Sequence, residues 1–210
     1  MKIAVLANGL LKEEMQQKIA GAHLSVAWAE SVDGLFEMHD ADAYFDLDFT
    51  FDVNHIVQLG KLFPKPVFIN SVVHTLSKIN HPFIRINAWA GFFTRNICEA
   101  AVQEQAQKNV AEKIFKEMKW DFQFVPDLPG MVSARIVAMI VNEAYYVLED
   151  HVSTKEQIDI AMKLGTNYPF GPFEWSEKIG LKNICDLLQE LSKTEGRYTI
   201  CEALLKDSSK

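Results

Sequence analysis

The feature that most constrains the fold is an alternation of short β-rich runs with helical stretches, which fills the first 125 residues and then stops. The β-rich runs are residues 2–6, 24–28, 43–47, 66–70, 83–87 and 122–125, and the main helical stretches are 11–20, 53–62 and 103–119. Strands that alternate with helices are typical of βαβ units, which build a mostly parallel sheet. We therefore predict an open α/β domain.

The alternation ends at the segment Pro126-Asp127-Leu128-Pro129-Gly130, whose prolines and glycine indicate a linker. After it, four helices are predicted. Three span residues 131–149, 180–192 and 199–206, and the fourth runs from a capping-box pattern at 153–156 to a C-cap at Gly165. The sequence thus predicts two domains, 1–126 and 127–210. A ligand is expected outside the carboxyl ends of the strands, where the domains meet.

Composition excludes several classes of protein. The 210 residues carry a net charge of -7, so no basic face is expected to bind nucleic acid. No apolar run approaches the ~18 residues that a membrane span needs, and the N-terminus runs into acidic residues, unlike a signal peptide. Three widely spaced cysteines predict buried thiols in a reducing compartment, with the cytoplasm as the default. Histidines and cysteines show no metal-ligand spacing, so no metal is expected.

The helical half resembles the C-terminal domain of 3-hydroxyacyl-CoA dehydrogenases. That family has a Pro-Gly opening with a nearby Arg, then Asn-Glu-Ala, an acidic helix, a Pro-x-Gly-Pro-x-Glu turn and Ile-Gly-Leu. The corresponding residues here are Pro129, Gly130, Arg135, Asn142, Glu143, Ala144, Ile158, Asp159, Ala161, Met162, Leu164, Gly165, Pro169, Gly171, Pro172, Glu174, Ile179, Gly180 and Leu181.

The N-terminal half resembles the same family more faintly. Residues 2–6 resemble the first Rossmann strand, and residues 85–91 fall at the family's His-Phe-Phe-Asn-Pro motif. The helical insertion after the second strand is short, only residues 31–41. The resemblance implies a reduced Rossmann-like parallel sheet followed by an all-α domain. It also implies oxidation of a 3-hydroxyacyl-CoA with NAD, a role in fatty acid metabolism, and a homodimer formed through the helical domain.

The resemblance assigns the site to Glu99 and Asn87, with Asn87 at the position of the catalytic histidine, twelve residues before the glutamate. A carboxamide does not titrate, so loss of the general base should lower the rate by about 10²–10⁴. Glu99 is interpreted either as a helix-face carboxylate or as a group facing a polar cleft. His74 is a possible substitute base. Asn142 either faces the same cleft or bonds locally within its helix.

The dinucleotide loop is also altered. The family's Gly-x-Gly-x-x-Gly pattern aligns with residues 7–12, where only Gly9 survives. Lys12, in place of the third glycine, should separate helix from strand or point its ammonium at the phosphates. Glu30 stands where an acid would bind the adenosine ribose. The alternative is that this segment has a purely structural role, as a strand–turn–helix that binds no ligand.

Two functions remain open, and a third arrangement is not excluded by the sequence. The first is an NAD-dependent 3-hydroxyacyl-CoA dehydrogenase with an altered site, using His74 or water as the base. The second is a pseudoenzyme that binds an acyl-CoA or a protein partner at the old cleft, and the altered histidine, altered glycines and short domain favour it. A third possibility is that the chain works with a separate subunit.

Overall fold

The computed structural model describes residues 1–93 and 95–209, which form two compact units that divide between Met131 and Val132. The sequence predicts this boundary between residues 126 and 127. The difference arises because the predicted linker packs on the α/β unit. The Gly130 N–H donates to the Val72 carbonyl at 2.8 Å, and the Asp127 carboxylate pairs with Arg85.

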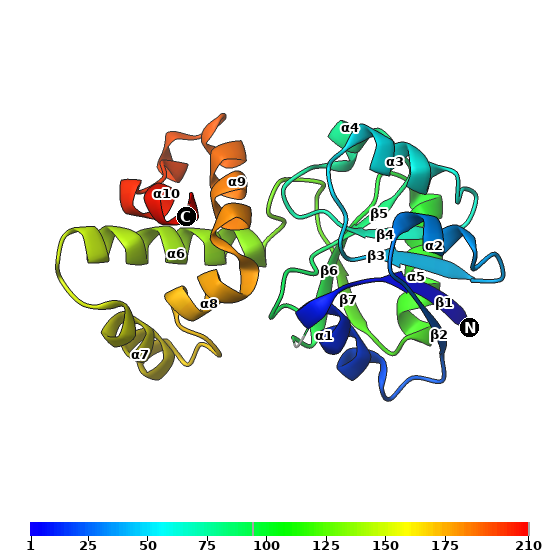
Figure 1. The fold of residues 1–210 in the computed structure, drawn as a ribbon, viewed down its shortest axis with the longest axis horizontal. Helices are drawn as coiled ribbons and strands as arrows, with labels where there is room; N and C mark the ends of the chain where they lie inside the picture. Colours follow the sequence, from blue (N-terminus) through cyan, green and yellow to red (C-terminus); the bar gives the residue numbers. More distant parts are fainter. Residues whose placement is uncertain (94, 210) are drawn as a thin grey trace. The chain divides into compact units, whose positions relative to one another are not determined.

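The first unit contains a seven-stranded sheet in the order β2-β1-β3-β4-β5-β6-β7 (Figure 1). The strands are β1 (Lys2–Leu6), β2 (Ser25–Ala29), β3 (Ala43–Asp46), β4 (Val67–Asn70), β5 (Ile84–Ile86), β6 (Ile97–Ala101) and β7 (Asp121–Phe124). Strands β1 to β5 are parallel, β6 is antiparallel to β5, and β7 is parallel to β6. The open, mostly parallel α/β fold is therefore confirmed.

Helices cover both faces of this sheet because each buried strand presents apolar side chains to both sides. The helices are α1 (Gly9–Ile19), α2 (Val32–Phe36), α3 (Val53–Gly60), α4 (Leu76–Ile79) and α5 (Gln105–Glu117). Phe45 of β3 packs with residues of α1 and α5, and its ring stacks on Phe68 at 4.4 Å. Its neighbour Tyr44 packs instead with residues of α2, α3 and α4. The alternation of side chains along β3 thus separates two cores.

The second unit is helical, as predicted. It contains α6 (Ser133–Glu149), α7 (Lys155–Thr166), α8 (Pro172–Ile179), α9 (Leu181–Ser192), a short 3₁₀ helix (Gly196–Tyr198) and α10 (Glu202–Ser208). Its interior is filled by apolar side chains of α6, α8, α9 and α10, among them Tyr145, Phe173, Leu187 and Leu204.

The structure differs from the predicted elements in several details. Strand β6 was not predicted, and it carries Glu99, which is therefore not a helix-face carboxylate. The cap of α7 is Thr154, whose hydroxyl accepts from the Gln157 N–H, one residue later than predicted. Helix α7 also passes through Gly165 to Thr166. Asn167 takes the left-handed conformation that ends the helix, because Asn tolerates a positive φ.

Three further observations concern the cysteines, membrane-spanning helices and metal ligands. All three cysteines are buried thiols, as expected. Within residues 1–93 and 95–209, no helix is long and apolar enough to cross a bilayer, and no group of three or more metal-ligating side chains is assembled.

Candidate functional site

The structure brings Asn87 and Glu99 together where the carboxyl end of β5 meets β6. Asn87 directly follows β5, and its backbone N–H donates to the Glu99 carbonyl at 3.0 Å. The Asn87 Nδ2 donates to the Glu99 Oε2 at 3.4 Å. Asn87 is buried and Glu99 is half-buried. The carboxamide therefore occupies the position from which an imidazole would engage this carboxylate.

Two residues that sequence analysis missed fix the chain after Asn87. The Asn70 Nδ2 donates to the carbonyls of Leu47 and Ala88 at 3.1 and 3.2 Å, and the Asn70 Oδ1 accepts from the Ala88 N–H at 3.1 Å. Asn70 therefore ties together the carboxyl ends of β3, β4 and β5. The buried Glu14 of α1 accepts from the Gly91 N–H at 2.8 and 3.0 Å. Asn70 offered a signal, a polar residue at the end of an apolar strand, whereas Glu14 lies among other polar residues of α1 and offered none.

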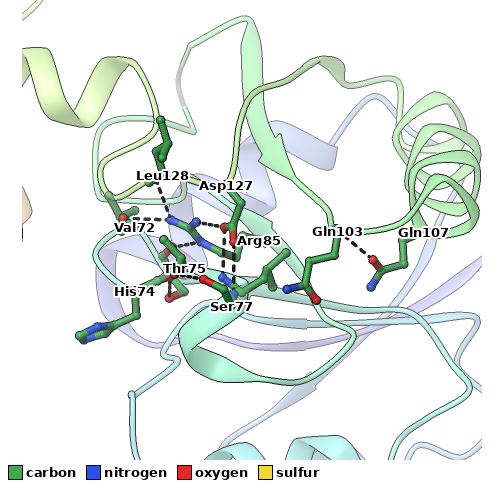
Figure 2. Close-up of polar contacts among 11 residues, drawn as sticks. Val72, His74, Thr75, Ser77, Arg85, Gln103, Gln107, Asp127 and Leu128 are labelled. Carbon is green, nitrogen blue, oxygen red and sulfur yellow. Dashed lines mark hydrogen bonds and ion pairs between the residues drawn. The ribbon is translucent and has the colours of Figure 1, made fainter.

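A buried arginine organises the loop that follows β4, as Figure 2 shows. The Arg85 Nε donates to the Ser71 carbonyl at 2.7 Å, and Nη2 donates to the carbonyls of Val72 and Leu128 at 3.1 and 3.4 Å. Nη1 pairs with the Asp127 carboxylate. Burial lowers the pKa of the Arg85 guanidinium, and Asp127 opposes that shift. The arginine thus joins the β4–α4 loop to the segment that leads out of the unit.

His74 lies in this β4–α4 loop, after β4, on the same rim as Asn87. Its backbone carbonyl accepts from the Ser71 hydroxyl at 2.9 Å, and its half-buried ring stacks on Phe51 at 3.9 Å. In Figure 2 the imidazole points away from the contacts around Arg85. The role of His74 as a substitute base stays a prediction.

The residues aligned with the dinucleotide loop lie at the end of β1. Gly9 begins α1 with φ +49°, and a Cβ there would meet no atom within 4 Å. The preceding Asn8 does not cap the helix, and its side chain instead donates to the Asp48 carboxylate. The Lys12 ammonium lies 5.3 Å from the centroid of the Trp28 ring.

This geometry fits a pyrophosphate poorly. A helix N-terminus attracts phosphate through its N–H groups and dipole, but here a carboxylate lies beside the turn. The lysine charge lies over an aromatic ring. Glu30 directly follows β2 and is exposed, the place expected for a ribose-binding acid. The contacts of Asn8 and Lys12 therefore do not fit the phosphates of NAD, and the role of Glu30 at the ribose stays a prediction.

Asn142 lies in the helical unit, buried on α6. Its Nδ2 donates to the Thr199 carbonyl at 2.9 Å, and its Oδ1 accepts from the Cys201 N–H at 2.9 Å. Both partners are remote in sequence, so the carboxamide is not bonded locally within its helix. It holds the segment that begins α10, and a ligand contact by Asn142 stays a prediction.

Several residues that carry the resemblance meet at the start of α8. The Asp159 carboxylate accepts from the N–H groups of Phe173 and Glu174 at 2.8 and 3.3 Å. The Glu174 carboxylate accepts from the Gly171 N–H at 2.9 Å and pairs with Lys163. A Cβ on Gly171 would lie 2.2 Å from the Asp159 Oδ1, so only glycine fits. This part of the pattern is a helix cap.

Comparison with known proteins places these observations in context. Residues 130–207 match the family described as 3-hydroxyacyl-CoA dehydrogenase, C-terminal domain. The chain is 34% identical over 129 residues to a 3-hydroxyadipyl-CoA dehydrogenase of Escherichia coli (strain K12), a match covering 60% of this chain and 27% of that protein. It is 34% identical over 104 residues to a 3-hydroxybutyryl-CoA dehydrogenase of Bradyrhizobium diazoefficiens, covering 49% and 34%. The chain thus matches about a third or less of these relatives.

A solved structure matches nearly the whole chain. The (S)-3-hydroxybutyryl-CoA dehydrogenase of Ralstonia eutropha superposes with a TM-score of 0.74, covering 98% of this chain and 92% of that one. The identity is 16%, so this likeness shows a shared fold.

Proposed function

Because residues 130–207 belong to the 3-hydroxyacyl-CoA dehydrogenase C-terminal domain family, we propose that this chain binds a 3-hydroxyacyl- or 3-oxoacyl-CoA thioester without oxidising it. The relatives are named as dehydrogenases that act on such thioesters. In this proposal, the chain still binds the substrate class of that lineage but no longer carries out the oxidation.

The observation that carries the proposal is the Asn87–Glu99 pair. A dehydrogenase of this lineage must take a proton from the substrate hydroxyl as hydride leaves, and a histidine oriented by a carboxylate does this near neutral pH. Here Asn87 donates to that carboxylate, and an amide does not take up a proton at neutral pH. An amide is still suited to hydrogen-bond a thioester or 3-oxo oxygen.

The dinucleotide turn supports the same conclusion. Bound NAD would supply the hydride acceptor, and the resemblance assigns its contacts in this chain to Gly9, Lys12 and Glu30. The Asp48 carboxylate hydrogen-bonded to Asn8 opposes phosphate binding at that turn, because two negative groups would lie side by side. We therefore include the loss of NAD binding in the proposal.

The assembly and location follow from the same lineage. We propose a homodimer formed through the helical unit, and exposed apolar residues on α6, such as Ile136 at 52% exposure, support it. A cytoplasmic location is supported by three buried thiols and no disulfide among the described residues. Sedimentation equilibrium measures the assembly directly, and a monomer at micromolar concentration contradicts the dimer.

The experiment compares ligands by thermal unfolding and isothermal titration calorimetry. We expect acetoacetyl-CoA to stabilise the chain, by about 2.7 kcal/mol at 100 times its Kd, and NAD to leave it unchanged. We also expect no formation of NADH from 3-hydroxybutyryl-CoA at high protein concentration. Stabilisation by neither ligand favours the protein-binding alternative and contradicts the proposal.

Two variants separate the remaining outcomes. NADH formation by the unaltered chain would overturn the proposal, and its loss in His74→Gln would identify His74 as the base. The Asn87→His variant restores an imidazole beside Glu99. Activity in that variant would show that NAD still binds and would refute the nucleotide part of the proposal. Continued inactivity is the expected result.

A further inference from the structure

A second set of reactive side chains lies where β3 ends. Asp46 is the last residue of β3, and its side chain is wholly buried. Thr50 follows in the exposed loop, and His55 occupies the first turn of α3, with 14% of its side chain exposed. Along β3, the side chain of Asp46 falls on the same side of the sheet as that of Tyr44, because strand residues alternate. Tyr44 packs with residues of α3, which places Asp46 toward His55.

Hydrogen bonds join these three residues in a chain. The His55 Nε2 bonds to the Asp46 Oδ2, and the His55 Nδ1 bonds to the Thr50 Oγ1 at 2.9 Å. An ionised carboxylate only accepts, so the network assigns the proton to Nε2. The Nδ1 atom then accepts from the Thr50 hydroxyl. A carboxylate thus orients an imidazole that is ready to take a proton from a hydroxyl.

The surrounding backbone holds this chain in place. Asp52 caps α3, and its carboxylate accepts from the N–H groups of Asn54 and His55 at 2.9 and 3.1 Å. The Phe49 ring packs edge-on against the imidazole at 5.4 Å. The imidazole is therefore positioned by a helix cap, an aromatic ring and two side-chain hydrogen bonds.

One oxygen of the Asp46 carboxylate is left over from this chain of hydrogen bonds. Its Oδ1 is buried and has no hydrogen-bond partner among the described residues. A buried oxygen without a hydrogen-bond partner is destabilising and needs an explanation, of which a catalytic role is one.

We propose that Asp46, His55 and Thr50 form an acyl-transfer site in which Thr50 is the nucleophile, a function beyond the acyl-CoA binding proposed above. The Thr50 Oγ bonds to the carbonyl carbon of an ester while its proton moves to the His55 Nδ1. The bond to the alcohol then breaks, and the alcohol leaves with that proton. Water attacks the resulting threonyl ester, gives one proton to His55, and releases the acid as Thr50 regains its hydrogen. The sum is ester plus water to acid plus alcohol.

The surroundings of Thr50 favour a neutral, apolar acyl group. Phe51, Val53 and Val57 are 47%, 74% and 49% exposed, and the two valines lie one turn apart on α3. The nearby carboxylates of Asp48 and Asp52 repel anions. Short neutral esters therefore fit, and the phosphates of a CoA thioester do not.

Hydrolysis of p-nitrophenyl butyrate by the full chain tests the site. We expect Thr50→Val and His55→Gln to lower the rate by about 10²-fold or more, and Thr50→Ser to retain it. Asp46→Asn should also lose activity, because an amide no longer fixes the same ring proton. Mass spectrometry after a short reaction should find butyrate on the peptide that contains Thr50.

Controls separate this site from background catalysis. An exposed histidine can cleave such esters by itself, so His23→Gln is the matched control and should leave the rate unchanged. Circular dichroism and acetoacetyl-CoA calorimetry on each variant report folding and the earlier proposal separately. Wild-type rates in Thr50→Val, or butyrate attached elsewhere, would overturn the acyl-transfer site even where acyl-CoA still binds.

Discussion

Removing Asp127 provides a strong test of how the α/β unit is held together. The Asp127→Ala variant leaves the wholly buried guanidinium of Arg85 without its counter-charge. Loss of one partner of a buried pair costs about 3–5 kcal/mol, and the low end applies because the Asp127 side chain is 18% exposed. The carboxylate also accepts from the N–H groups of Leu76 and Ser77 at 3.1 and 3.3 Å, a cap contributing about 1 kcal/mol.

The expected loss is therefore about 4 kcal/mol, a large part of the 5–15 kcal/mol typical of a domain. Urea unfolding followed by tryptophan fluorescence measures it in a Trp175→Phe background, because the other three tryptophans, Trp28, Trp89 and Trp120, lie in the α/β unit. The free energy of unfolding follows from the midpoint and the slope.

A double variant supplies the control. Adding Arg85→Met to Asp127→Ala removes the stranded charge, so the double variant should be less destabilised than the sum of the two single changes. A loss below about 1 kcal/mol in Asp127→Ala, or strict additivity in the double variant, would refute the role assigned to this pair.

Three further predictions concern other parts of the chain. Gly171→Ala should lower the thermal unfolding midpoint of the helical unit, because the added Cβ would lie 2.2 Å from the Asp159 Oδ1. The control Gly165→Ala, whose Cβ would have no atom within 4 Å, should leave that midpoint unchanged or raise it. Equal midpoints for the two variants would contradict the cap. Burial raises the pKa of the Cys98 thiol to about 12, so a disulfide reagent at neutral pH should modify this cysteine only after unfolding, and rapid labelling of the folded chain would show otherwise. Burial also raises the pKa of the Asp46 carboxyl above 3.8, so its contribution to stability is fully present below pH 3.8 and is lost as pH rises through the folded pKa. Over that rise, Asp46→Asn should gain stability relative to the unaltered chain. Parallel profiles of stability against pH for the two proteins would exclude the effect.

Local patterns in the sequence predicted most of the fold. The bounds of β1 agree with the predicted run, and the other predicted strands agree to within one residue. Strand β6 escaped prediction because its Cys-Glu-Ala-Ala core has little β propensity, and pairing with β5 and β7 stabilises it. Helix α8 was missed because its opening, Gly171-Pro172, was interpreted only as a turn, although proline is favoured at the first helical position.

The candidate site was less predictable because its contacts join remote residues. Resemblance paired Asn87 with Glu99, and the structure brings the two side chains together. Nothing local in the sequence shows that Asn70 bonds to residues 18 and 23 positions away, or that Asp127 pairs with Arg85 across 42 positions. Such contacts depend on strand order, which the alternation of elements does not specify.

The cap formed by Asp159 and Gly171 has a consequence for tracing ancestry. Asp159 and Gly171 are needed for as long as α8 must start at the same residue. Asp159 accepts from backbone N–H groups at that start, and Gly171 leaves room for its carboxylate. None of those contacts depends on whether a proton or a hydride ever moves elsewhere in the protein. Sequence matches that include this cap therefore indicate a shared ancestral fold. They give no information on whether the ancestral reaction is retained.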